Sequence, residues 1–272
     1  MRALPRRSAL LAALAALALP ATAAADDAGS VSASGGPVQA TLSWQAADFG
    51  VKDPRLTVAR AGATLFDGAP VSSADLCSVG CIFAGTGADA PLKVVDLDGD
   101  GEPEVLVDTF TGGAHCCVIS DVLKFTGAAY ARSEFNWGSG GYKLADRDRD
   151  GRPELSGLDP TFEDAFTSHA ASFGPPVVLA FDATSKGGFR DVTRRFPSVV
   201  RRNAKEALHI LGLARRQHGE TEGAVAAYVA DLYLLRRARE VRPYLSRARK
   251  RGDVPRGFDR RLLAFLHKQG YR

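Results

Sequence analysis

Two nine-residue segments carry closely spaced carboxylates in the same order. Asp96–Glu104 reads DLDGDGEPE, and Asp146–Glu154, 50 positions later, reads DRDRDGRPE. Oxygen-bearing side chains at positions 1, 3, 5 and 9, with glycine at position 6, make a loop that wraps a hard cation such as Ca²⁺. Without a cation, two carboxylates about 4 Å apart repel each other by roughly 1 kcal/mol in water and about 4 kcal/mol at a protein-like dielectric. The pattern therefore predicts a calcium loop in each segment, and the alternative is a pair of acidic hairpin turns without metal.

The loops differ from an EF-hand. An EF-hand needs a bidentate Glu at position 12, whereas position 12 is Val107 in the first segment and Gly157 in the second. The flanks are also different, because Lys93–Val95 and Val105–Val107 have the β-branched composition of strands. The sequence therefore predicts strand–loop–strand calcium sites in a protein built from repeats of roughly 50 residues.

This pattern between short strands resembles the FG-GAP or VCBS-type repeat of β-propeller proteins, including integrin α-subunits. The resemblance covers about residues 90–195 and implies propeller-blade-like antiparallel β repeats. Two clear copies are present, fewer than the four blades of the smallest propellers, and Gly112–Ala114 and Phe173–Pro175 are at best remnants of two further family segments. The implied ligands are the side chains of Asp96, Asp98, Asp100 and Glu104 with the carbonyl of Glu102, and those of Asp146, Asp148, Asp150 and Glu154 with the carbonyl of Arg152.

The elements around the loops follow from periodicity. Alternating and β-branched runs predict a strand at 38–44 and a hairpin at 56–66. The region 38–195 is predicted to be the β-repeat domain, with an insertion at 161–176 that forms a short helix or loop near the second site. The two repeats predict four strands each, at 92–95, 104–109, 118–125 and 129–135, and at 142–145, 154–156, 177–181 and 189–192.

From about residue 196 the hydrophobic period becomes helical. Each helix is expected to present a single apolar face, and the chain is expected to break at Pro255. The predicted fold class is thus mainly β with a basic α-helical C-terminal region, 196–272, forming a small bundle. The expected faces are Leu208, Leu211 and Ala214, then Val225, Tyr228, Val229 and Leu232, then Val241, Tyr244, Leu245 and Ala248, and last Leu262, Phe265 and Leu266.

The N-terminus has the features of an export signal. Basic residues precede an apolar run from Ala9 to Leu19, and a small-residue cleavage site ends at Ala25. This organisation predicts a cleaved secretory signal peptide over 1–25 and a secreted, extracellular or periplasmic protein. The following segment, 26–37, is rich in Ser and Gly and is expected to be flexible. No other stretch predicts a transmembrane segment.

Charge is divided between the two halves of the chain. Residues 26–189 hold 11 basic and 23 acidic side chains, a net charge of −12, and residues 190–272 hold 21 and 8, a net charge of +13. Opposite charges favour docking of one half on the other. Alternatively the basic helices bind an anionic cell-surface polymer or form a solvated surface. Nucleic acid is an unlikely partner for an exported chain.

Four cysteines, Cys77, Cys81, Cys116 and Cys117, stand in two close pairs. In an exported chain an even number of cysteines predicts disulfides. We expect two bonds that tie the first pair to the second, since adjacent residues of a strand point to opposite faces. The alternatives are a vicinal or redox-active disulfide, and a zinc or copper site that includes His115.

Enzymatic motifs are missing from the sequence, which has no G-x-S-x-G, H-E-x-x-H or P-loop. The predicted function is a calcium-binding, non-enzymatic binding or structural module. One alternative is an extracellular hydrolase or lyase acting on a polysaccharide or cell-wall polymer, with carboxylates such as Asp108, Asp121 and Glu163. The other is a Cys/His metal or redox protein.

The two loops differ in charge. The first has five acids and no base, a net charge of −5, and the second has four acids and three arginines, a net charge of −1. Because ligand charge tunes calcium affinity, the nine residues alone predict tighter binding at the first loop.

Overall fold

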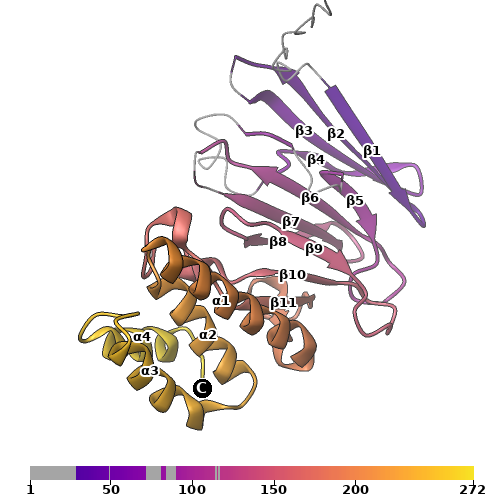
Figure 1. The fold of residues 1–272 in the computed structure, drawn as a ribbon. Coiled ribbons are helices and arrows are strands. Elements are labelled where there is room, and N and C mark those ends of the chain that lie inside the picture. The colour runs from indigo at the N-terminus through magenta and orange to yellow at the C-terminus, as the bar shows by residue number, and fades with distance from the viewer. Residues whose placement is uncertain (1–28, 49, 72–80, 84–89, 114, 116) are drawn as a thin grey trace, which may run out of the picture.

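A computed structural model describes residues 29–48, 50–71, 81–83, 90–113, 115 and 117–272. In this part of the chain, three four-stranded antiparallel sheets are followed by four α-helices (Figure 1). The first sheet contains β1 (Gly29–Gly35), β2 (Val38–Ala46), β3 (Val51–Arg60) and β4 (Ala63–Gly68), the second β5 (Leu92–Val95), β6 (Glu104–Phe110), β7 (Val118–Phe125) and β8 (Tyr130–Asn136), and the third β9 (Tyr142–Ala145), β10 (Glu154–Leu158), β11 (Pro176–Phe181) and β12 (Phe189–Asp191). The helices are α1 (Pro197–Gln217), α2 (Glu222–Leu234), α3 (Val241–Lys250) and α4 (Phe258–Lys268).

The prediction of a mainly β protein with a helical C-terminal region is confirmed. Each sheet pairs its strands in chain order, and all eight strands of the two predicted repeats are present with bounds within about two residues. The described residues form no closed barrel or propeller. The prediction of a flexible segment at 26–37 was wrong where the structure describes it, because Gly29–Gly35 forms β1 and pairs with β2 over its whole length.

The sheets stack because central strands bury alternate residues on opposite faces. Val105 and Val107 of β6 pack against the first sheet, whereas Leu106 between them packs against the third sheet. A strand covered on both faces reads as a continuous apolar run, and Val105–Val107 is such a run, with every residue fully buried. The second sheet is therefore the middle layer of the stack (Figure 1).

The outer faces of the first and third sheets are covered differently. The outer face of β2 carries polar side chains such as Gln39 and Thr41, which are exposed. The third sheet is instead covered by α1, through a small core in which Val178 of β11 meets Phe196 and Val199. The helices thus close one end of the stack in Figure 1.

The helical region has its own core around α2. Helix α2 is buried on nearly all sides, so the single apolar face expected there was wrong, while the predicted face of α3 is buried as expected. In α1 the buried residues are Val200, Ala204, Ala207 and Leu211, and the expected Leu208 is 43% exposed. Alanines at helical spacing supply this face, and they carry a weak hydrophobic signal.

The insertion at 161–176 forms short 3₁₀ turns, at Pro160–Phe162 and His169–Ala171, which agrees with the predicted short helix or loop. It follows β10, however, at the opposite end of that strand from the second loop, so its predicted place near the second site was wrong. Phe162 from this segment is buried in the helical core. The insertion therefore joins the third sheet to the helices. None of the helices in the described ranges has the length and apolar composition that crossing a bilayer requires. Residues 1–28, which include the predicted signal peptide, lie outside the described residues.

Candidate metal centre

The first loop joins β5 to β6 and is organised by its own carboxylates. Asp96 accepts hydrogen bonds from the backbone N–H groups of Gly99 at 2.7 Å and Gly101 at 2.9 Å. Glu104, at the start of β6, accepts from the N–H of Leu97 at 2.8 Å. Gly99 and Gly101 have φ angles of 77° and 85°, which glycine adopts at no steric cost. The glycines thus allow the chain to curl around the acidic side chains.

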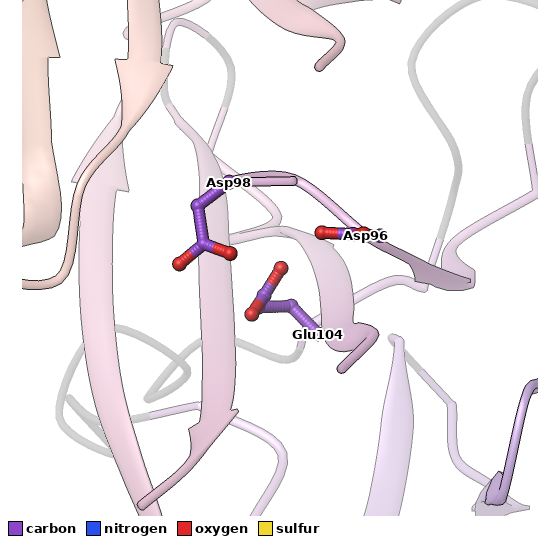
Figure 2. A group of neighbouring side chains, drawn as sticks. All are labelled: Asp96, Asp98 and Glu104. Carbon is purple, nitrogen blue, oxygen red and sulfur yellow. The ribbon is translucent and has the colours of Figure 1, made fainter. Parts of the chain in front are cut away.

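Three of the predicted ligands meet in this loop. Carboxylate oxygens of Asp96, Asp98 and Glu104 all lie within 4.8 Å of one another. Figure 2 shows the carboxylates of Asp98 and Glu104 facing each other, with Asp96 beside them. Because Ca²⁺–oxygen distances are about 2.3–2.6 Å, two oxygens on one ion lie at most about 5 Å apart. The spacing and the purely oxygen donor set therefore fit a hard divalent cation.

Two other predicted ligands of the first loop have different partners. Asp100 accepts from the N–H of Glu102 at 2.9 Å and from Lys124 at 2.8 Å, and it is not among the carboxylates that gather within 4.8 Å. The Glu102 carboxylate forms a bidentate pair with Arg60 of β3, at 2.8 Å for both contacts. Its side chain ties the loop to the first sheet, and only its carbonyl is left for the predicted ligand role.

Lys124 of β7 reaches the same carboxylates, although nothing in the loop sequence points to it. Its Nζ lies 2.7 Å from Asp98, 2.8 Å from Asp100 and 2.9 Å from Glu104. Two of these three partners belong to the candidate metal group. The ammonium therefore already supplies a positive charge to the first loop.

Burial dominates the electrostatics of Glu104. The side chain is fully buried, and this burial raises the pKa of Glu104 to about 7, although the hydrogen bond from Lys124 acts in the opposite direction. The same group of acids raises the pKa of Lys124 above its usual range, against the effect of burial. A cation that takes the place of the proton stabilises the charged form of such a buried carboxylate.

The second loop, between β9 and β10, repeats this arrangement. Carboxylate oxygens of Asp146, Asp148 and Glu154 lie within 4.8 Å of one another. Asp146 accepts from the N–H groups of Asp150 at 3.1 Å and Gly151 at 3.0 Å. Glu154 is again buried at the start of its strand, accepts from the N–H of Arg147 at 3.0 Å and has a pKa raised by burial.

The cations around the second loop are arginines on its exposed side. Arg195 lies 2.6 Å from Asp148, and Arg152 pairs with Asp150 at 2.8 Å. Asp150, like Asp100, is therefore outside the three-carboxylate group, and the Arg152 side chain is engaged away from it. Arg152 also packs over the first loop, because a Cβ at Gly99 would lie 2.7 Å from its Cγ. The two loops are thus neighbours.

The residue that corresponds to Lys124 in the second repeat is Ala180. In the second sheet Val105 pairs with Leu123, and in the third sheet Leu155 pairs with Leu179, so the residues that follow occupy equivalent positions. A hollow of about 20 Å³ lies at Ala180, where β11 supplies no cation, and it is lined by Asp150 and Glu154 together with Arg152, Arg190 and Arg195. Aligning the repeats beyond the loops matches 122–125 with 178–181, so the sequence contains this Lys-to-Ala difference, but it does not show that the residue contacts the loop.

The cysteine region is described only in part. Cys81 and Cys117 are each in a disulfide bond, and a disulfide sulfur offers no thiolate to zinc. Cys77 and Cys116 lie outside the described residues, so the expected pairing stays a prediction. The ring of His115 lies 4.5 Å from that of His169, centroid to centroid. His169 is in turn 3.0 Å from the Asp164 carboxylate.

The three carboxylates that the sequence offers as catalytic groups of a hydrolase or lyase have structural partners. Asp108 is fully buried, bonded to Ser120 at 2.6 Å and Tyr142 at 2.8 Å, and paired with Lys93 at 3.0 Å. It thereby links the second and third sheets. Arg132 lies 3.7 Å from the buried Asp121.

Glu163 likewise has a structural role. It accepts two hydrogen bonds from Ser139, from the backbone N–H at 2.8 Å and from the hydroxyl at 2.7 Å. This residue therefore fastens the insertion to the loop before β9.

Comparison with known proteins gives two partial relatives. The chain is 34% identical over 154 residues to a protein of Synechocystis sp. whose name describes it as a probable thylakoid lumen protein, covering 54% of this chain and 44% of that protein. It is 29% identical over 164 residues to a protein of Sinorhizobium fredii named only as uncharacterized, covering 60% of this chain and 24% of that protein. The chain thus spans less than half the length of each. No known family pattern and no solved structure matches it.

Proposed function

We propose that the chain is an exported calcium-binding β-repeat protein that acts as a non-enzymatic binding or structural module. The observation that carries this proposal is the recurrence of one geometry. In two equivalent loops, three carboxylates that are separated in sequence come within 4.8 Å of one another. A buried Glu at the base of each loop adds a carboxylate that is costly to leave charged without a cation.

We further infer that each sheet is a blade-like repeat of the FG-GAP or VCBS kind. The four-stranded order is the same in all three sheets, and the acidic loop joins the first strand to the second in two of them. In the first sheet the corresponding connection between β1 and β2 is the short turn at Gly36–Pro37, so we expect no metal there.

Export is supported by two observations. The predicted signal peptide is one, and the lumen location in the name of the Synechocystis relative is the other. An exported protein meets millimolar calcium more often than a cytosolic one, and weak oxygen-ligand sites suit that range. Disulfide bonding of Cys81 and Cys117 agrees with an oxidising compartment.

Thermal unfolding of the mature chain tests the proposal. A ligand that binds only the folded state stabilises it by RT ln(1 + [L]/Kd), about 2.7 kcal/mol at a hundredfold excess over Kd. EDTA should lower the melting temperature, and Ca²⁺ should restore it more effectively than Mg²⁺, which demands a stricter geometry. Melting curves that are unchanged by EDTA and by Ca²⁺ at fixed ionic strength would contradict the proposal.

A further inference from the structure

A large open cleft lies between the third sheet and helix α1. It has a volume of about 820 Å³, far more than a single small ion fills. One wall is formed by β9, β10 and the loop before β9, and the other by α1. The side chains that line the cleft include none of the candidate metal-binding carboxylates, although Arg147 of the second loop is part of its wall.

Positive charge is concentrated on both walls. Lys143 of β9 and Arg147 of the second loop stand on the sheet side, and Arg202 stands on the helix side. Within the described part of the chain, none of the three has a carboxylate at ion-pair distance. Glu206 is the single acidic residue that lines the cleft, so the lining carries a net charge of +2 from three bases and one acid.

Arg147 has unused hydrogen-bonding capacity. One terminal nitrogen of its guanidinium donates to Ser156, but its Nε is buried and has no hydrogen-bond partner. A buried donor without a partner costs free energy. An anion in the cleft cannot reach this enclosed Nε, but it would meet the second terminal nitrogen of the guanidinium, which is not among the buried unpartnered atoms of the described residues.

The rest of the lining suits a hydroxylated ligand with ring faces. Ser139, Ser156 and Asn203 line the cleft with neutral oxygens that accept hydrogen bonds, because their own donors are engaged by Glu163, by the Lys143 carbonyl, and by Gly174 and Asp231, respectively. Phe173 offers a partly exposed aromatic side chain. Gly140 and Gly141 let the chain before β9 approach a ligand without side chains in the way. A cleft with three separated cations, hydroxyls and an aromatic ring matches a sugar chain with carboxylates on successive residues.

We propose that this cleft binds an acidic oligosaccharide, with Arg147 and Arg202 contacting its carboxylates from opposite walls. The inference rests on the proposed function, because it supplies the ligand class of the binding module. It also gives the second loop a direct connection to binding. Arg147 is position 2 of that loop, and its N–H donates to the buried Glu154, so calcium in the loop would hold the backbone of Arg147 in place.

The test is binding of a galacturonic acid hexamer to the mature protein, measured by calorimetry. Binding is measured first in EDTA, because uronates themselves bind Ca²⁺, and the neutral glucose hexamer and inorganic phosphate serve as control ligands. Wild-type protein should bind the acidic hexamer at least tenfold more tightly than either control. Equal binding of phosphate, or equally tight binding of double-stranded DNA, would overturn the proposal in favour of a general basic surface.

Matched variants locate the site. Arg202→Gln and Lys143→Gln change exposed cleft residues and should each raise Kd about tenfold, as should Arg147→Gln. Arg216→Gln changes an exposed arginine on the same helix outside the cleft and should change Kd less than twofold. Equal losses for Arg202→Gln and Arg216→Gln would overturn the assignment to the cleft.

The two proposals fail in different ways. Hexamer binding that depends on Arg202 without any effect of Ca²⁺ on stability would refute the calcium sites and support the cleft. Stabilisation by Ca²⁺ without hexamer binding would refute the cleft alone. Arg147→Gln is interpreted only if its melting temperature in Ca²⁺ equals that of the wild type, and Arg202→Gln and Lys143→Gln carry the test otherwise.

Discussion

The two acidic loops share a nine-residue pattern and a strand–loop–strand setting, but they differ in the cation that the neighbouring strand supplies. In the first loop, Lys124 of β7 lies within 3 Å of three carboxylates. In the second, Ala180 of β11 leaves a small hollow beside Asp150 and Glu154. The motif thus determines which carboxylates gather. A residue on the third strand of each sheet, 20 positions after the first loop and 26 after the second, determines how much of their charge that strand balances.

This difference reverses the affinity order that the loop charges alone predict. A Ca²⁺ ion in the first loop must displace a largely buried ammonium from Asp98 and the buried Glu104, and the displaced Lys124 loses two of its three carboxylate partners. In the second loop it must displace Arg195 from Asp148, an exposed pair, and such pairs contribute little. We therefore expect the second loop to bind Ca²⁺ more tightly in the wild-type protein.

The largest expected effect follows from Lys124→Met, which removes the tethered cation. Calcium affinity at the first loop should rise at least about a hundredfold, or about 2.7 kcal/mol, so that the first loop becomes the tighter site. In EDTA the same variant should unfold more easily by about 3 kcal/mol, since Glu104 is left buried without its partner. Calorimetry and thermal unfolding measure the two effects.

Lys124→Arg keeps the charge and is the control. It should leave calcium affinity close to that of the wild type. An affinity for Ca²⁺ that is the same in the Met and Arg variants would show that Lys124 does not compete with the ion.

The next largest effect is expected from the reciprocal change, Ala180→Lys. An ammonium placed beside Asp150 and Glu154 should weaken calcium binding at the second loop about tenfold or more. Ala180→Met adds similar bulk without charge and separates crowding from electrostatics. If Ala180→Met weakens calcium binding as much as Ala180→Lys does, the effect comes from filling the hollow and not from the added charge. That result would contradict the explanation of the two affinities by charge.

The pH dependence in EDTA offers a third test. The folded-state pKa of Glu104, about 7, lies above its ordinary value of 4.5, so the folded state binds the proton more readily than the unfolded state does between these values. Stability should therefore be fully present below about pH 4.5 and fall by about 3 kcal/mol as the pH rises to about 7. Glu104→Gln should remove the contribution of Glu104 to this slope and leave those of other buried carboxyls, measured by urea unfolding at several pH values.

Glu154→Gln provides the comparison for the second loop. The pKa of Glu154 is also raised by burial, so this variant should reduce the same slope. A slope that neither variant changes would place the titrating group elsewhere, for example at Asp231 of α2, whose pKa burial raises to about 8.

The smallest effect is expected from Arg195→Gln. Its side chain is 47% exposed, and its partner Asp148 is a candidate ligand. Because solvent screens this pair, calcium affinity at the second loop should rise by at most about fivefold, and the affinity of the first loop should not change. A rise as large as that of Lys124→Met at the first loop would refute the distinction between buried and exposed cations.

Much of this architecture could be predicted from the sequence. The β-branched and apolar composition of the two matching repeats located strands β5–β12, because strands covered on both faces read as short apolar runs. The Ser/Gly alternation of β1 was misread, since small side chains give little hydrophobic signal and the strand is held by pairing with β2. The three-carboxylate groups followed from the loop pattern. The contact of Lys124 with them required the sheet register, which no local pattern contains.

Calorimetric titration of the EDTA-treated mature protein with Ca²⁺ tests the central claim most directly. The wild type should bind two ions with distinct affinities. Asp148→Ala should remove the tighter phase and Asp98→Ala the weaker one, each leaving the other intact. Absence of binding heat together with unchanged stability in Ca²⁺, or retention of two ions by both variants, would contradict the account.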